Sequence, residues 1–116
     1  MSASLRMRED GGLKIGTVEG DVDLSSARDL ASEILEAVPS NAQALVLDLT
    51  AVRYLDSTGV SMLLDLHRSL DARRQRLCVV LPRTSHLWRL FEITGLPSIL
   101  RIGESVMDAK EAAAAP

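Results

Sequence analysis

The chain has 116 residues, of which 47% are hydrophobic, 25% charged and 3% aromatic, and its formal net charge is −3. This length predicts one domain over residues 1–116, with an ordered part at 5–112 and an aliphatic core. The negative charge argues against nucleic acid as a partner. No stretch is long enough to span a bilayer, and residues 1–12 lack the apolar segment of a secretion signal, so we expect a cytoplasmic protein with no membrane partner.

The first half of the chain predicts a hairpin, a helix and a buried strand. Apolar and charged residues alternate over residues 5–8, and a turn at 10–12 leads into a second strand at 13–18, which together indicate an antiparallel hairpin. A loop at 20–23 then precedes a helix that Ser25 or Ser26 could cap. The nearly continuous apolar run at 44–49 is typical of a strand that helices cover on both faces.

The second half alternates helices and strands. A half-buried helix begins near Val60, a short strand follows at 77–81, and a helix capped by Thr84 or Ser85 closes at Gly95. A last strand at 98–102 and a terminal helix at 105–115 complete the chain, and the alanine-rich end of that helix is expected to fray. These elements predict an α/β fold, a mixed sheet with an antiparallel edge and helices packed against it.

Cysteine and histidine are too few to suggest a metal centre. The single Cys78 excludes an intramolecular disulfide, and its apolar neighbours predict a buried, reduced thiol. His67 and His86 lie far apart and without the paired spacing of metal ligands. Glycine-rich nucleotide-binding motifs are also missing, so we expect neither a metal nor a cofactor.

The segment Asp56-Ser57-Thr58-Gly59 places a hydroxyl where a predicted strand gives way to a helix. The first turn of a helix has unpaired N–H groups and the positive end of the helix dipole, so Ser57 could either cap the helix or carry a phosphate. A phosphate would leave the fold largely unchanged. It would, however, oppose any partner that covers the site, because burying an unpaired charge is costly.

A catalytic role for Ser57 is a weaker alternative. Ten residues on or beside one helix separate Ser57 from His67, about 15 Å along the axis, which is too far for a general base. His86 belongs to another predicted helix, and only the fold could bring it close, so a hydrolase using Ser57 and His86 stays a third hypothesis. We expect no enzymatic activity.

Three segments resemble, in chain order, the anti-sigma factor antagonist family, whose members are single STAS domains that regulate bacterial sigma factors. They are the GDVD sequence at 20–23, the strand and motif at 45–59, and the LFEITGL sequence at 90–96, and the resemblance extends over residues 5–112. It implies a STAS-like mixed sheet, with an N-terminal antiparallel hairpin and then parallel strands, and four to five packed helices.

The resemblance also implies a phosphorylation switch. In the family, the serine directly after the aspartate is modified by an ATP-binding partner that is both serine kinase and anti-sigma factor, which corresponds to Ser57, with Thr58 as the second choice. The unmodified form binds the anti-sigma factor and frees the sigma factor. Phosphorylation ends this binding, and a separate serine phosphatase restores it. Asp23 matches the acidic loop residue that lies near the acceptor in the family.

We therefore expect a partner-binding surface made of two segments. Its predicted residues are Asp21, Asp23 and Ser25 from the loop, and Asp56, Ser57, Thr58, Gly59, Ser61 and Asp65 from the motif and the helix after it. Ser61 departs from the family, which usually has glycine there, and could alter partner choice. Arg53, Tyr54 and Trp88 are further candidates, although the position of Trp88 on its helix favours partial burial over a role as an interface anchor. The alternative function is a STAS subunit of a signalling scaffold or a lipid-transport complex, without a phosphorylation cycle.

Overall fold

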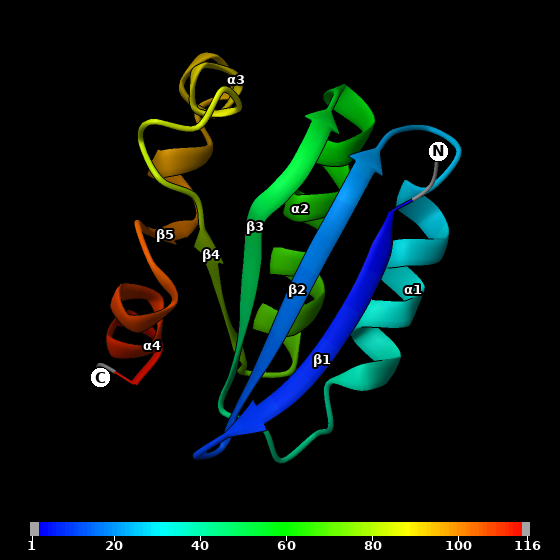
Figure 1. Ribbon diagram of the computed structural model, residues 1–116. Helices are drawn as coiled ribbons and strands as arrows, with labels where there is room; N and C mark the ends of the chain where they lie inside the picture. The colour runs from blue at the N-terminus through cyan, green and yellow to red at the C-terminus, as the bar shows by residue number, and fades with distance from the viewer. Residues whose placement is uncertain (1–2, 115–116) are drawn as a thin grey trace.

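The computed structural model describes residues 3–114 and shows a sheet flanked by helices on both faces (Figure 1). The sheet order is β1-β2-β3-β4-β5, with β1 antiparallel to β2 and the other neighbours parallel, which confirms the predicted hairpin and mixed sheet. The elements in chain order are β1 (Ser4–Asp10), β2 (Leu13–Val22), α1 (Ala27–Ala37), β3 (Ala44–Leu55), α2 (Ser57–Ala72), β4 (Arg76–Val80), α3 (Trp88–Thr94), the 3-10 helix η1 (Leu96–Ser98), β5 (Arg101–Gly103) and α4 (Val106–Ala114).

Two hydrophobic clusters lie on the two faces of the sheet. The larger contains Leu45 and Leu47 of β3 together with side chains of α1, α2 and α3, and the smaller contains Val46 of β3 and Cys78 of β4 beneath α4. Alternate residues of β3 thus face opposite clusters, as the pleat of a strand requires. The prediction that helices cover the run at 44–49 on both faces is confirmed, and so is the prediction of a buried thiol at Cys78.

Several predicted boundaries are wrong. The second strand continues to Val22, through most of the segment predicted as a loop, and β3 continues to Leu55 rather than ending at 49. Beyond residue 49, only Val52 and Leu55 of β3 are buried. This half of the strand is therefore largely exposed to solvent and lacks the continuous apolar run of the first half.

The later elements also differ from the sequence-based expectation. Helix α2 begins at Ser57 rather than near Val60, and α3 begins only at Trp88, because turns joined by backbone hydrogen bonds occupy 82–87. Pro97 lies in η1, so the last strand is confined to 101–103. The alanine-rich end after residue 112 was expected to fray, but α4 is helical to Ala114, and residues 115–116 lie outside the described part.

Candidate partner-binding site

Asp56, and not Ser57, caps helix α2. The backbone of Asp56 is extended, and its carboxylate accepts hydrogen bonds from the N–H groups of Thr58 at 3.0 Å and Gly59 at 3.2 Å. These bonds satisfy two of the donors that the first turn of a helix leaves unpaired. Ser57 is the first residue of the helix, and its side chain is exposed. The capping role, which the sequence left open for Ser57, therefore belongs to its neighbour.

The end of β2 lies directly beside the start of α2. Strands β2 and β3 are paired at Asp21 with Tyr54 and at Val22 with Leu55. A Cβ atom at Gly59 would lie 2.5 Å from Cδ1 of Leu55 and 3.2 Å from Cγ1 of Val22, so α2 approaches both strand ends closely at this glycine. The two segments that were predicted to share a surface are neighbours in the fold.

The loop after β2 is held by its own side chains. The Asp23 carboxylate accepts hydrogen bonds from the Ser25 N–H at 3.0 Å and the Ser25 hydroxyl at 2.7 Å, and the bond from the Ser25 side chain is the main reason that the pKa of Asp23 lies below its ordinary value. The buried Ser26 hydroxyl donates to the carbonyl oxygen of Asp21 and accepts from the N–H of Asp23. Ser26 occupies the N-cap position of α1 without a capping bond from its side chain, and Ser25 lies before that position, so the predicted serine cap is wrong.

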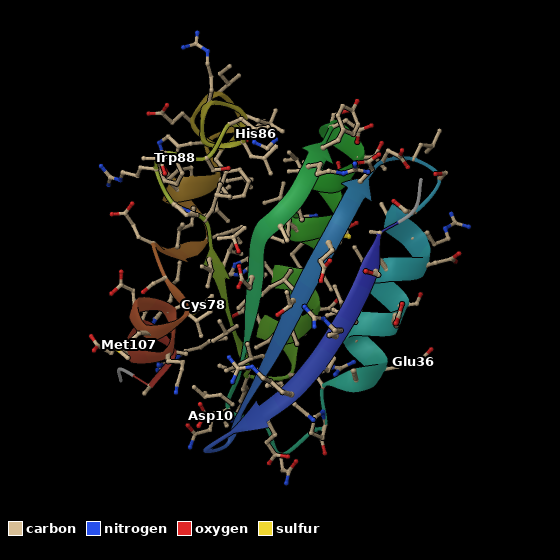
Figure 2. The ribbon with its side chains drawn as sticks, in the orientation of Figure 1. Asp10, Glu36, Cys78, His86, Trp88 and Met107 are labelled. Carbon is tan, nitrogen blue, oxygen red and sulfur yellow. The ribbon has the colours of Figure 1, made fainter. Side chains whose placement is uncertain are left out.

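The remaining polar contacts connect this end of β3 to its surroundings. The Arg53 guanidinium lies 3.6 Å from the Asp21 carboxylate. His86 donates a hydrogen bond from Nε2 to the carbonyl oxygen of Arg53 at 2.6 Å, and Figure 2 places His86 at the end of the molecule where β3 stops. His86 thus connects the loop before α3 to β3. His67 is half-buried on α2, as predicted.

A groove between α1 and α2 begins next to the motif. It has a volume of about 320 Å³, and Thr58, Ser61 and Asp65 contribute its α2 side. Sequence analysis did not assign any residue of α1 to this surface. The missed lining residues are Ala27, Arg28, Ala31, Ser32 and Leu35 on α1 and Met62 on α2. The signal available in the sequence was the pair of alanines four positions apart, which leaves room on one face of a helix.

Comparison with known proteins establishes the family. The STAS domain family profile matches residues 4–109 of the chain. The protein belongs to the STAS domain family. It is 35% identical over 85 residues to the anti-sigma-B factor antagonist of Listeria monocytogenes, covering 73% of this chain and 74% of that protein. It is 29% identical over 108 residues to the anti-sigma-F factor antagonist RsfB of Mycobacterium tuberculosis, covering 93% and 87%.

A solved structure agrees with this assignment. The crystal structure of an anti-sigma factor antagonist from Mycobacterium paratuberculosis matches with a TM-score of 0.80 and 26% identity, covering 96% of this chain and 93% of that one. The chain is thus a STAS domain of the anti-sigma factor antagonist family, as the resemblance in sequence implied.

Two large apolar side chains are exposed on the loop after β2 and at the end of β3. Leu24, in the loop after β2, is 80% exposed, and Tyr54, next to the end of β3, is 50% exposed. Tyr54 was a candidate from the sequence, whereas Leu24 was missed although it is an apolar residue within a polar loop. Trp88 is partly buried, as predicted, and its ring stacks with that of Phe91 at a centroid distance of 6.2 Å, while the guanidinium of Arg83 lies 5.5 Å from its centroid.

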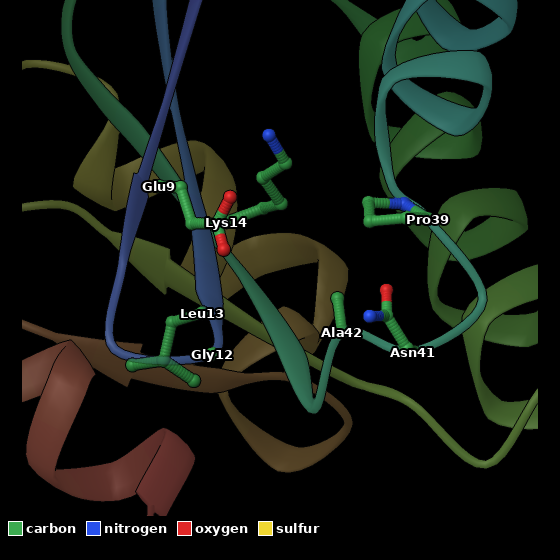
Figure 3. A pocket seen from close by; sticks show the side chains of 7 residues that line it. All are labelled: Glu9, Gly12, Leu13, Lys14, Pro39, Asn41 and Ala42. Atoms are coloured by element: carbon green, nitrogen blue, oxygen red, sulfur yellow. The ribbon is translucent and has the colours of Figure 1, made fainter.

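A small pocket lies at the other end of the STAS domain, next to the hairpin turn. It lies between the hairpin turn and the connection from α1 to β3, and its volume of about 40 Å³ leaves room for roughly one water molecule (Figure 3). Over residues 3–114, no group of three or more His, Cys, Asp or Glu side chains is arranged to hold a metal ion. In the same range, no helix combines the length and the apolar character needed to cross a membrane.

Proposed function

We propose that this STAS domain is a cytoplasmic anti-sigma factor antagonist, without enzymatic activity of its own, that phosphorylation at Ser57 switches off. The unmodified form binds an anti-sigma factor and thereby frees a sigma factor. The same anti-sigma factor carries ATP and acts as the serine kinase, and a serine phosphatase reverses the modification. The observation that carries the proposal is the exposed hydroxyl of Ser57 on a helix start that Asp56 already caps.

The charge of the phosphate accounts for the direction of the switch. It adds roughly −1.5 to −2 charges at the helix start, which the helix dipole favours by about 0.3 to 1 kcal/mol. The Asp56 carboxylate beside it opposes the new charge, so little change in the fold follows. A partner that covers Ser57 would have to bury this charge at a cost of several kcal/mol, which corresponds to at least about 100-fold weaker binding.

The proposed contact surface follows the two neighbouring segments. Asp21, Asp23 and Ser25 contribute the loop side, and Thr58, Ser61 and Asp65 contribute the wall of the α1–α2 groove. Gly59 is buried against Leu55 and Val22, so its part in the proposal is to bring α2 close to the strands rather than to touch the partner. Thr58 is half-buried, which makes it the second choice as acceptor after Ser57.

Site mapping by mass spectrometry tests the acceptor. The wild-type protein is incubated with ATP and, one at a time, with each serine-kinase anti-sigma factor of the source organism. We expect phosphate on Ser57 with at least one of them and none on Ser57→Ala, while Ser40→Ala, which changes an exposed serine between α1 and β3, remains a substrate. Modification solely at other residues would contradict the assignment.

A binding experiment separates the proposed function from its alternative. Ser57→Asp is expected to lose binding to the anti-sigma factor and to keep the wild-type circular dichroism spectrum. Equal recovery of membrane-transporter or scaffold subunits by wild-type and Ser57→Ala baits, with no phosphorylation by any anti-sigma factor, would instead favour a STAS subunit of a larger assembly.

A further inference from the structure

The loop between β2 and α1 presents an apolar side chain to solvent. Leu24 is 80% exposed, more than any other large hydrophobic residue in the described part of the chain. Single exposed apolar residues are common on protein surfaces, so this exposure alone does not indicate binding. The loop that carries Leu24 and the charges around it supply the further evidence.

The backbone on both sides of Leu24 is fixed by hydrogen bonds. The Asp23 carboxylate accepts from the backbone and the side chain of Ser25, and the Asp23 carbonyl oxygen accepts from the N–H groups of Ser26 and Ala27 at 3.1 and 2.9 Å. The buried Ser26 hydroxyl adds the bond to the carbonyl of Asp21 at 2.9 Å. A side chain displayed from a rigid loop loses little entropy on binding, which favours its use as a contact.

Leu24 also follows closely after the end of β2, which lies beside the start of α2. Val22, two residues before it, lies against Gly59 of α2, and Asp21 is paired with the half-exposed Tyr54. Three carboxylates, those of Asp21, Asp23 and Asp56, belong to the same strand ends and loop. Among the described residues, the one cation in contact with them is Arg53, 3.6 Å from Asp21, which leaves an excess of negative charge. An apolar side chain among acidic groups fits an apolar pocket with basic groups at its edge.

We propose that Leu24 is the apolar anchor of the contact with the anti-sigma factor, inserting into an apolar pocket of that protein whose edge carries lysine or arginine. This inference rests on the proposed function, since the partner is the same anti-sigma factor that is proposed to cover Ser57. Asp23 is then a positioning residue, because its bonds to Ser25 hold the loop that presents Leu24.

Affinity measurements with matched variants test the anchor. The probe is the purified anti-sigma factor that phosphorylates Ser57 in the wild-type protein. Leu24→Ala is expected to raise the Kd about 10-fold and to raise the KM for phosphorylation with little change in kcat, as loss of an anchor does. Met107→Ala, on α4 and 71% exposed, removes an apolar side chain of similar exposure far from the end of β3 and should leave the Kd unchanged (Figure 2). Both variants should unfold at the wild-type temperature. A change of less than about twofold for Leu24→Ala would overturn the proposal.

Thiol labelling gives a second, direct readout. Cys78 is 0% exposed, so the thiol of Leu24→Cys or Met107→Cys would be the only accessible one in each variant. We expect the anti-sigma factor to slow maleimide labelling at position 24 at least about 10-fold and to leave position 107 unaffected, and phosphorylation of Ser57 to remove the protection. Equal labelling rates at position 24 with and without bound partner would refute the anchor.

The two proposals fail in different ways. If the wild-type protein binds the anti-sigma factor but Leu24→Ala binds equally well, the anchor alone is wrong. If the wild-type protein neither binds nor is phosphorylated by any anti-sigma factor of the source organism, the proposed function is wrong and the anchor with it.

Discussion

Asp56 and Ser57 are adjacent residues with different tasks at the start of α2. The Asp56 side chain holds the N–H groups of Thr58 and Gly59, while the Ser57 side chain is exposed on the first helical residue. Because the cap does not depend on Ser57, a phosphate on this residue would remove no bond that the helix start needs. The proposed modification is therefore compatible with a stable fold.

Removing the cap should destabilise the protein. Asp56→Ala loses both hydrogen bonds to the first turn, and we expect the free energy of unfolding to fall by about 0.5 to 2 kcal/mol in urea denaturation. Asp56→Asn keeps an acceptor oxygen and should retain most of the stability. Asp65→Ala, an exposed carboxylate within the same helix, serves as the control, and an equal loss for both alanine variants would show that the cap contributes nothing specific.

Gly59 should tolerate even a single methyl group poorly. A Cβ atom there would lie 2.5 Å from Cδ1 and 2.8 Å from Cγ of Leu55, so the helix or the leucine must move. The gain in helix propensity from alanine offsets part of this cost, and we expect Gly59→Ala to lose about 1 to 2 kcal/mol in urea denaturation. Ser61→Ala, exposed on the same helix, should be neutral or slightly stabilising. A stability of Gly59→Ala equal to wild type would mean that α2 packs less closely than described.

Among the elements, α4 is held on the sheet by hydrogen bonds and an ion pair as well as by hydrophobic packing. The guanidinium groups of Arg76 and Arg101 donate to the carbonyl oxygens of Ala113 and Ala112 at 3.0 and 2.9 Å, which satisfies acceptors in the last turn of the helix. Lys110 forms an ion pair with Asp10 of the hairpin. Packed below α4, Cys78 is buried, and burial raises the pKa of its thiol.

Displacing α4 should therefore expose Cys78. At Gly103, a Cβ atom would lie 2.8 Å from the backbone nitrogen of Ala109, and a backbone atom cannot move without shifting the helix. We expect Gly103→Ala to increase the rate of Cys78 labelling by a thiol reagent under native conditions by at least about 10-fold, through easier local opening. Glu111→Ala, an exposed change on α4, should keep the slow wild-type rate, and an unchanged rate in Gly103→Ala would show that α4 does not shield the thiol.

The ion pair between α4 and the hairpin also predicts a pH dependence. The hydrogen bond and the charge of Lys110 hold the pKa of Asp10 below its ordinary value. A carboxyl with a lowered pKa stabilises the fold above its ordinary pKa, near about 4, and this contribution disappears as the pH falls through the folded value. The unfolding free energy of Asp10→Asn should thus decrease less than that of wild type between about pH 5 and pH 2. Parallel pH profiles would show that the pair is not stabilising.

Sequence patterns predicted the order and kind of the elements better than their ends. The hairpin, the buried first half of β3 and the half-buried α2 follow from local alternation and helical periodicity, which each segment carries by itself. The second half of β3 was missed because Thr50, Ala51, Arg53 and Tyr54 are exposed and interrupt the apolar run. Docking of α4 could not be predicted, since its partners Asp10, Arg76 and Arg101 are brought to it only by the sheet.

Over the whole molecule, the parallel pairing of β2 with β3 creates the candidate site. It brings the ends of both strands together, so the loop after β2 and the start of α2 share one end of the sheet, away from the hairpin turn (Figure 1). Both segments were predicted from the sequence, and the motif by itself indicated an exposed hydroxyl. The α1 side of the groove and the exposure of Leu24 could not be predicted, because they depend on how α1 and its preceding loop lie against α2.

The central claim is that a charge on Ser57 decides whether a partner can cover this end of the sheet. The most direct test is the Kd of one anti-sigma factor for the unmodified protein and for the same protein stoichiometrically phosphorylated on Ser57. The account predicts at least about 100-fold weaker binding after phosphorylation, with the circular dichroism spectrum unchanged. Equal affinity of the two forms would contradict it.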